Sequence, residues 1–143
     1  MPTARRLTSE DYEAAIALWQ RSGLPSIRPH GRDSQAGFAQ QIAQGQIVLG
    51  LEDDRKLIGI VVATNDTRKG WINRLAIDPD YRRKGYGTML IHAAEEALRS
   101  IGIKVIAALI EDWNDASLAL FKREGYAVHP DIYYVSKRDL ETD

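Results

Sequence analysis

The segment from Leu75 to Leu90 restricts the possible folds more than any other part of the chain, and it reads LAIDPDYRRKGYGTML. Its pattern predicts the end of a strand, a basic loop containing Gly85 and Gly87, and the start of a long helix. The first backbone N–H groups of a helix have no partner within the helix and carry partial positive charge. We therefore expect this loop to bind a cofactor that carries a diphosphate group.

The loop also places Arg82, Arg83 and Lys84 directly before the two glycines. Spacing excludes two common phosphate loops. A P-loop needs Gly, four residues, Gly, Lys and Ser or Thr, and no such run occurs. A dinucleotide fingerprint needs a third glycine three residues after Gly87, where this chain has Leu90. Neither of these loop types accounts for the segment.

Length and composition indicate one globular α/β domain over residues 1–143. A charged share of 27% with a net charge of -1 gives no reason to expect a nucleic-acid or membrane partner. The chain has no cysteine, and His30, His92 and His129 lack ligand spacing, so we expect no metal. No apolar run has the length of a signal peptide or a membrane span, and a cytoplasmic location is expected.

The first half of the chain predicts two helices placed between an edge strand and three antiparallel strands. Capping and stop signals bound the helices, and runs rich in Val, Ile and Leu mark the strands. The helices are expected over Glu10 to Arg21 and from Asp33 or Ser34 to Gly45; the strands are expected over Thr3 to Leu7, Gln46 to Glu52, Leu57 to Thr64 and Trp71 to Ile77.

The second half predicts a helix, a strand, a shorter helix and closing strands. The apolar run from Lys104 to Ile110 is typical of a strand buried on both faces and parallel to a neighbour. The other elements are a helix from Gly85 to Ser100, a helix from Asn114 or Asp115 to Gly125, and closing strands over Tyr126 to Val128 and Asp131 to Lys137. These elements predict an α/β domain with a mixed central sheet and about four helices.

Two motifs resemble the GNAT superfamily of N-acetyltransferases. The residues from Arg82 to Gly87 match its signature of Arg or Gln, two residues, Gly, one residue, and Gly or Ala. NDASLALFKREGY, from Asn114 to Tyr126, is similar to a later segment of that family. The resemblance implies a single GNAT-like domain with a splayed parallel strand pair. It also implies an enzyme that moves an acetyl group from acetyl-CoA directly to a primary amine.

The resemblance further implies where acetyl-CoA would bind. Backbone N–H groups from Arg83 to Thr88 would wrap the pyrophosphate, and pantetheine would insert between Trp71 to Ile77 and Lys104 to Ile110. Backbone groups on the first of these strands would hold the pantetheine amide and the thioester carbonyl. The expected cofactor-binding residues are Leu75, Ala76, Ile77, Arg82, Arg83, Lys84, Gly85, Tyr86, Gly87, Thr88, Asn114, Ser117 and Phe121.

The expected proton-transfer groups differ from those common in the family. Many members use a glutamate on the strand before the loop, where this chain has Asn73 and Arg74. Glu111 and Asp112 are the carboxylates nearest to the expected cleft, and we expect Glu111, ahead of Asp112, to assist deprotonation of the amine through water. The usual tyrosine of the later helix is replaced by Phe121, and Tyr134 is the expected substitute among Tyr86, Tyr126, Tyr133 and Tyr134.

In this family the N-terminal helices and the last strands form the acceptor side of the cleft, which implies Trp19, Arg28 and Tyr133 here. Arg28 could meet a carboxylate of the acceptor. The acceptor could be an amine of a small molecule, a peptide or a protein, and a homodimer is compatible with the family. Two alternatives stay open: a non-catalytic acyl-CoA-binding or regulatory domain, and an α/β domain whose glycine loop is only a turn.

Overall fold

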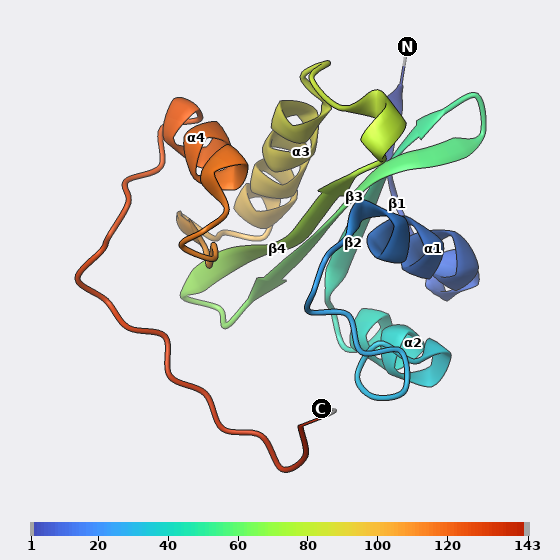
Figure 1. Ribbon diagram of the computed structural model, residues 1–143, viewed down its shortest axis with the longest axis horizontal. Helices are drawn as coiled ribbons and strands as arrows, with labels where there is room; N and C mark the ends of the chain where they lie inside the picture. Colours follow the sequence, from blue (N-terminus) through green and yellow to red (C-terminus); the bar gives the residue numbers. More distant parts are fainter. Residues whose placement is uncertain (1, 142–143) are drawn as a thin grey trace.

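The computed structural model describes residues 2–141 and shows a mixed sheet of five strands with helices on both faces (Figure 1). The strands run in the order β1-β2-β3-β4-β5 across the sheet. Neighbours are antiparallel from β1 to β4, whereas β4 and β5 are parallel. The predicted mixed sheet is therefore confirmed. The strands are β1 (Thr3–Arg6), β2 (Ile47–Asp53), β3 (Lys56–Asn65), β4 (Lys69–Ile77) and β5 (Val105–Ala108).

The α-helices of the described chain are α1 (Tyr12–Ser22), α2 (Gln35–Ala43), α3 (Tyr86–Ser100) and α4 (Asp115–Arg123). Two short 3₁₀ turns, Ser9–Asp11 and Pro79–Tyr81, precede α1 and the glycine loop. The first helix was predicted to start at Glu10, but the 3₁₀ turn delays its start, and Thr8 rather than Ser9 is the capping residue. Asn114 caps α4, as predicted, by accepting a hydrogen bond from the backbone N–H of Ser117 at 3.2 Å.

Each face of the sheet has its own core. On one face α3 buries Leu90, Ile91 and Leu98 against β2, β3 and β4, and α4 lies beside it (Figure 1). On the other face α1 and α2 pack Trp19 and Phe38 against the opposite side chains of the same strands. The recurrence of apolar residues in α3 at three and four positions predicted such a helix on a sheet. The two cores hold β4 between them.

The parallel pair opens partway along β4. Pairing with β5 ends at Ile72 and Ala108, and β4 continues to Ile77 without β5 beside it. A bulge lies in the same stretch, because the register against β3 shifts by one residue and Arg74 has a φ of +54°. The predicted splay is thus present, with an open edge on the C-terminal half of β4.

Two predictions about the C-terminal part are wrong for the described residues. The run from Lys104 to Ile110 contributes only the short β5, and Val105 is 52% exposed because β5 is the edge of the sheet. The predicted closing strands over Tyr126 to Val128 and Asp131 to Lys137 do not form, and the chain after α4 runs along the outside (Figure 1). Strand propensity depends on a pairing partner, and this segment has none among the described residues. No described helix is both long enough and apolar enough for a membrane span.

Candidate functional site

A cavity of about 1030 Å³ lies where β4 and β5 separate. Its walls include the loop after α1, the open half of β4, the start of α3, the loop from β5 into α4, and α4 itself, and side chains of α1, α2, β2 and β3 complete them. The predicted site residues that line it are Trp19, Leu75, Ala76, Ile77, Arg82, Arg83, Gly85, Tyr86, Gly87, Thr88, Glu111, Asn114, Ser117 and Phe121. The structure therefore brings together residues that lie far apart in the sequence.

The start of α3 forms one wall as a helix end without a side-chain cap. Gly85 is its N-cap residue with a φ of +81°, and no side chain accepts from the first turn. Met89 is the first residue whose N–H bonds back into the helix, to the carbonyl of Gly85 at 3.2 Å. Arg83 also has a left-handed φ of +64°, which costs about 1 kcal/mol or more for a residue with a Cβ. The backbone is thus shaped to present its N–H groups to a ligand.

The glycines of this loop fit a phosphate ligand for two different reasons. A Cβ at Gly85 would meet nothing within 4 Å, so the space above this backbone is open. A Cβ at Gly87 would lie 3.0 Å from Cδ2 of Leu120 in α4, so this position is packed tightly. A pyrophosphate group could approach the N–H groups of Tyr86 and Thr88 on the open side. The residues present therefore fit the pyrophosphate of CoA.

The basic residues before the glycines divide between the cavity and the surface. Arg82 and Arg83 line the cavity, and Arg82 donates to the carbonyl of Ser22 at 3.3 Å. Lys84 lies over the ring of Tyr81 at 5.7 Å and is not part of the cavity wall. Of the three basic residues expected to bind the cofactor, Arg82 and Arg83 therefore line the cavity and Lys84 does not.

A buried carboxylate anchors the start of this loop. Asp78 is 1% exposed and accepts from Arg21 Nη2 at 2.5 Å and from the N–H of Asp80 at 2.9 Å. Burial acts to raise the pKa of Asp78, but the backbone N–H of Asp80 and the guanidinium of Arg21 outweigh it, so the pKa lies below its ordinary value. Asp78 is therefore held ionised between the sheet and the glycine loop.

The bulge of β4 is held in place from the α1 side. The indole Nε1 of Trp19 donates to the carbonyl of Arg74 at 3.1 Å, and Arg74 lies 5.6 Å from the Trp19 ring. Trp19 is only 2% exposed, and it forms part of both the core and the cavity wall. Leu75 to Ile77 follow the bulge and line the cavity next to it.

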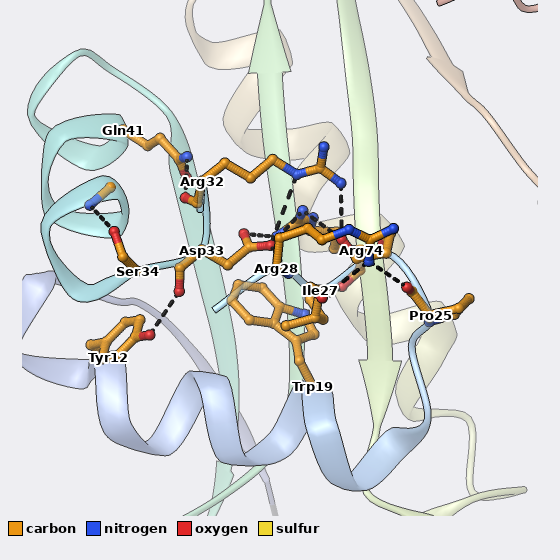
Figure 2. A network of polar contacts seen from close by, with 12 residues as sticks. Tyr12, Trp19, Pro25, Ile27, Arg28, Arg32, Asp33, Ser34, Gln41 and Arg74 are labelled. Carbon is orange, nitrogen blue, oxygen red and sulfur yellow. Dashed lines mark hydrogen bonds and ion pairs between the residues drawn. The ribbon is translucent and has the colours of Figure 1, made fainter. Parts of the chain in front are cut away.

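An ion pair that sequence reasoning missed joins the loop after α1 to β4 (Figure 2). Arg74 forms a two-pronged pair with Asp33, which is 4% exposed. Asp33 also accepts from the backbone N–H of Arg28 at 2.7 Å, and its carbonyl accepts from the hydroxyl of Tyr12 at 2.7 Å. The sequence suggested Asp33 only as a helix start, since a separation of 41 positions between the partners leaves no local signal.

The candidate proton-transfer groups lie in different environments. Glu111 lines the cavity and is exposed, as the prediction required. Asn73 also lines it, and its amide donates to the hydroxyl of Thr64 at 3.2 Å. Tyr133 and Tyr134 are 91% and 63% exposed on the segment after α4 and do not line the cavity, because the closing strands do not form.

Two further aromatic residues occupy the α4 side. Phe121 lines the cavity, is 5% exposed and packs edge-on against Tyr126 with ring centroids 5.0 Å apart. The hydroxyl of Tyr126 donates to Glu95 at 2.6 Å, and burial together with this carboxylate raises the pKa of Tyr126. Of the tyrosines considered as acids, Tyr86 is the one that lines the cavity within the described chain. No group of three or more His, Cys, Asp or Glu residues within residues 2–141 could hold a metal ion.

Several solved structures share this architecture. PaiA N-acetyltransferase from Thermoplasma acidophilum, solved in complex with coenzyme A, superposes with a TM-score of 0.80 at 22% identity, covering 90% of this chain and 91% of that one. The aminoglycoside N-acetyltransferase AAC(6')-Iy in complex with CoA gives 0.80 at 17% identity over 96% and 95% of the two chains. The ribosomal-protein-S18-alanine N-acetyltransferase from Escherichia coli gives 0.75 at 23% identity over 87% and 77%. These likenesses establish the fold.

The family follows from the sequence itself. The sequence model of the acetyltransferase (GNAT) family matches residues 13–126, which contain all but the first residue of α1, the whole of β2 to β5, the glycine loop and α4. That range includes every described element that lines the cavity. The chain belongs to the GNAT family of acetyltransferases.

Proposed function

We propose that this protein transfers an acetyl group from acetyl-CoA directly to a primary amine, using the cavity between β4 and β5. The observation that carries the proposal is that the uncapped start of α3 and the open edge of β4 face the same cavity. The first suits a pyrophosphate, and the second suits an extended chain that carries amides. A ligand with both parts is pantetheine diphosphate, the common portion of acyl-CoA compounds.

The start of α3 would bind the diphosphate mainly through backbone. The N–H groups of Tyr86, Gly87 and Thr88 belong to the first helical turn and have no side-chain cap. Arg82 and Arg83 line the same part of the cavity and add full positive charge. Asn114 and Ser117 form the cap of α4 and also line the cavity. They would contact the ligand from the α4 side.

The open half of β4 would hold the reacting end. Acetyl-CoA supplies an acetyl thioester, whose carbonyl carbon is the electrophile for an amine. Backbone groups of Leu75, Ala76 and Ile77 line the cavity past the last β4–β5 pair. A backbone N–H at this edge would stabilise negative charge on the carbonyl oxygen during attack, and the bulge at Arg74 would set its direction.

Proton transfer is assigned to Glu111, acting through water. An amine with a pKa of about 10.4 is mostly protonated at neutral pH and must lose a proton before it attacks. Glu111 supports this role because it lies in the cavity wall and is exposed, whereas Asn73 cannot accept a proton. The departing thiolate, with a pKa of about 8.5, can leave without an acid. If Tyr134 protonates the departing thiolate, the exposed segment after α4 would have to move to the cavity.

The acceptor side would be bounded by Trp19 and the loop after α1, and the acceptor could be a small molecule, a peptide or a protein. We further propose a single catalytic domain over residues 1–143 and a cytoplasmic location, where acetyl-CoA is plentiful. A homodimer is compatible with this proposal.

The test combines calorimetric titration with CoA and thiol release from acetyl-CoA in the presence of an amine panel. Wild-type protein should bind CoA and release thiol with at least one amine. Glu111→Gln should lower kcat about tenfold or more at neutral pH while CoA affinity stays unchanged. Asp112→Asn, an exposed neighbour, is the matched control.

Three outcomes are distinguishable. CoA binding without turnover on any amine would favour the alternative of an acyl-CoA-binding regulatory domain. Absence of CoA binding would contradict both functions. An unchanged rate in Glu111→Gln would exclude the assigned base but would leave the transferase proposal intact.

A further inference from the structure

The chain after α4 contains an apolar run that is exposed to solvent. Residues 132–137 read IYYVSK, and the first four side chains of this run are 63% to 91% exposed. Residues that alternate along a strand share a face, and here both sets are apolar: Ile132 with Tyr134, and Tyr133 with Val135. A strand with two such faces is typical of the interior of a sheet. Residues 132–137 are called the closing segment below.

The closing segment has no strand beside it in its own chain. It forms no backbone hydrogen bond to any strand within residues 2–141. From α4 the chain runs along the outside of the molecule without joining the sheet (Figure 1). The free energy available from burying the apolar run is therefore not gained within one copy.

The sheet has an unpaired edge of matching character at β5. This strand is last in the strand order and carries no charged residue. Val105 on β5 and Leu109 just after it are 52% and 62% exposed. Their neighbours Ile106, Ala108 and Ile110 are partly buried against the core on the α3 side. Unpaired backbone groups with apolar side chains on both faces make β5 a template for a further strand.

The opposite edge of the sheet differs from β5 in its charge. β1 contains Arg5 and Arg6, and Arg5 forms ion pairs with Asp11 and Glu52. Charged side chains on an edge strand are a common means of preventing another strand from pairing with it. Of the two edges, β5 is therefore the one that is suited to receive a strand.

The connection between α4 and the closing segment favours exchange between two copies. It contains Pro130, whose ring fixes φ, and the preceding His129 is disfavoured in helical backbone. Such a stiff connection restrains the closing segment from folding back onto β5 of its own chain. The β5 edge of a second copy can be reached without that reversal, as in other exchanged elements.

We propose that two copies of this chain exchange their closing segments, so that each adds a strand to β5 of the other. A two-fold dimer makes this contact twice. The two tyrosines of each closing segment expose roughly 300 Å². With the surfaces that cover them, the two contacts would bury on the order of 1,200 Å² or more, which is the area that a stable dimer needs. The proposal concerns the assembly of the protein and does not depend on the proposed function.

The exchange would also bring the second copy to the cavity. Ala108, Leu109 and Ile110 line the cavity at the end of β5. A strand added beside them would lie next to this wall and would carry Tyr133 and Tyr134 of the second copy. The exchange would thus supply the movement that a role of Tyr134 in proton transfer requires.

The first test measures the oligomeric state by analytical ultracentrifugation. Wild-type protein should be a dimer at micromolar concentration. Tyr134→Asp places a charge in the middle of the added strand, and Val105→Lys places one on the receiving edge. Each should raise the dissociation constant of the dimer about a hundredfold or more. Val128→Asp is the matched control, because Val128 is also exposed after α4 but lies before the closing segment.

Circular dichroism of the three variants should match that of wild-type protein, because all three positions are exposed. A monomeric wild-type protein would overturn the proposal. So would a dimer that keeps its affinity in both Tyr134→Asp and Val105→Lys, since its interface would lie elsewhere.

The second test separates exchange from closure within one chain. The chain has no cysteine, so introduced cysteines report only on the chosen positions. Ala107→Cys on one chain is refolded and oxidised with Tyr133→Cys, Tyr134→Cys or Val135→Cys on a second chain of different mass. At least one combination should give a disulfide between the two chains, because paired residues of neighbouring strands lie within disulfide distance.

The same pairs of cysteines are then placed on a single chain. Exchange predicts covalent dimers under denaturing conditions, whereas closure of the segment onto its own β5 predicts monomers with an internal disulfide. Internal disulfides, or no disulfide in any combination, would overturn the proposal.

Discussion

The proposed donor side and the proposed acceptor side of the cavity are held by different means. The donor side is a nearly continuous stretch of chain, from Leu75 to Thr88, and it presents backbone N–H groups. The acceptor side depends on side chains, above all on the pair between Asp33 and Arg74, which lie 41 residues apart. A backbone site tolerates side-chain changes as long as its glycines remain. A side-chain site depends on each partner being present.

The largest expected effect tests the acceptor side. Asp33→Ala would leave the largely buried guanidinium of Arg74 without its carboxylate and would remove the acceptor for the N–H of Arg28. We expect urea denaturation to show that the free energy of unfolding falls by about 3 kcal/mol. This value is at the lower end of the range for removing one partner of a buried ion pair. Asp131→Ala, on the exposed segment after α4, should change it by less than about 0.5 kcal/mol.

Asp33→Ala should also affect CoA binding and acceptor binding differently. The folded fraction should still bind CoA with unchanged affinity, because no donor-side group contacts Asp33. Acceptor KM should rise, because the loop after α1 would lose its ion pair to Arg74 in the cavity wall. Equal losses on both sides would show that the two halves are not independent.

The next effect tests the donor side. Gly85→Asp adds a negative charge above the open backbone where the diphosphate is proposed to bind. CoA affinity should fall about a hundredfold or more, or about 2.7 kcal/mol, measured by calorimetry. Gly45→Asp is a matched control, since Gly45 also has a positive φ, has nothing within 4 Å of its Cβ position, and lies outside the cavity.

The control separates backbone strain from charge. Both substitutions place a residue with a Cβ in the left-handed region and should cost similar stability, about 1 kcal/mol. Only Gly85→Asp should weaken CoA binding. If the two variants bound CoA equally well, the assignment of the α3 start as the diphosphate site would be wrong.

A smaller effect concerns the α4 wall. Tyr126→Phe removes the hydroxyl that donates to Glu95 at 2.6 Å and should lower the free energy of unfolding by about 1 kcal/mol. Thiol release should not change, because this hydroxyl is committed to Glu95 and its raised pKa makes it a weaker acid. A loss of kcat without a loss of stability would instead identify Tyr126 as a catalytic acid.

The last prediction concerns pH and the anchor of the glycine loop. The pKa of Asp78 is lower in the folded protein than its ordinary value of about 3.9, so its ionised form stabilises the fold. This contribution is complete above that ordinary value and is lost as the pH falls through the lower, folded pKa. Asp78→Asn should therefore show a smaller decrease in unfolding free energy between pH 5 and about pH 2.5 than wild-type protein. Parallel profiles would contradict this role of Asp78.

The local structure of the proposed donor side could be predicted from the sequence. The glycine spacing, the preceding arginines and the cap at Asn114 are local signals, and the structure shows Gly85 at a left-handed N-cap and Asn114 accepting from Ser117. The pattern of apolar residues in α3 likewise located a helix that packs on the sheet. These features depend on residues that are neighbours in the chain.

The acceptor side could not be predicted in the same way. The sequence suggested Arg28, Tyr133 and Tyr134, whereas the cavity wall contains Arg32 and neither tyrosine. The direction of a side chain on an irregular loop depends on what packs against that loop. Residues 127–141 likewise have the composition of strands without a described strand to pair with.

Neighbouring residues thus encoded the glycine loop before α3, the helix caps and the alternation of strands and helices, because φ preferences and cap hydrogen bonds act over a few residues. The bulge at Arg74, the point where β4 leaves β5, and the choice of Arg32 over Arg28 arose only when distant segments packed together. Strand register and buried ion pairs are set by partners far away in the chain. For that reason the tertiary structure, and not the local pattern, decided which charged side chains line the cavity.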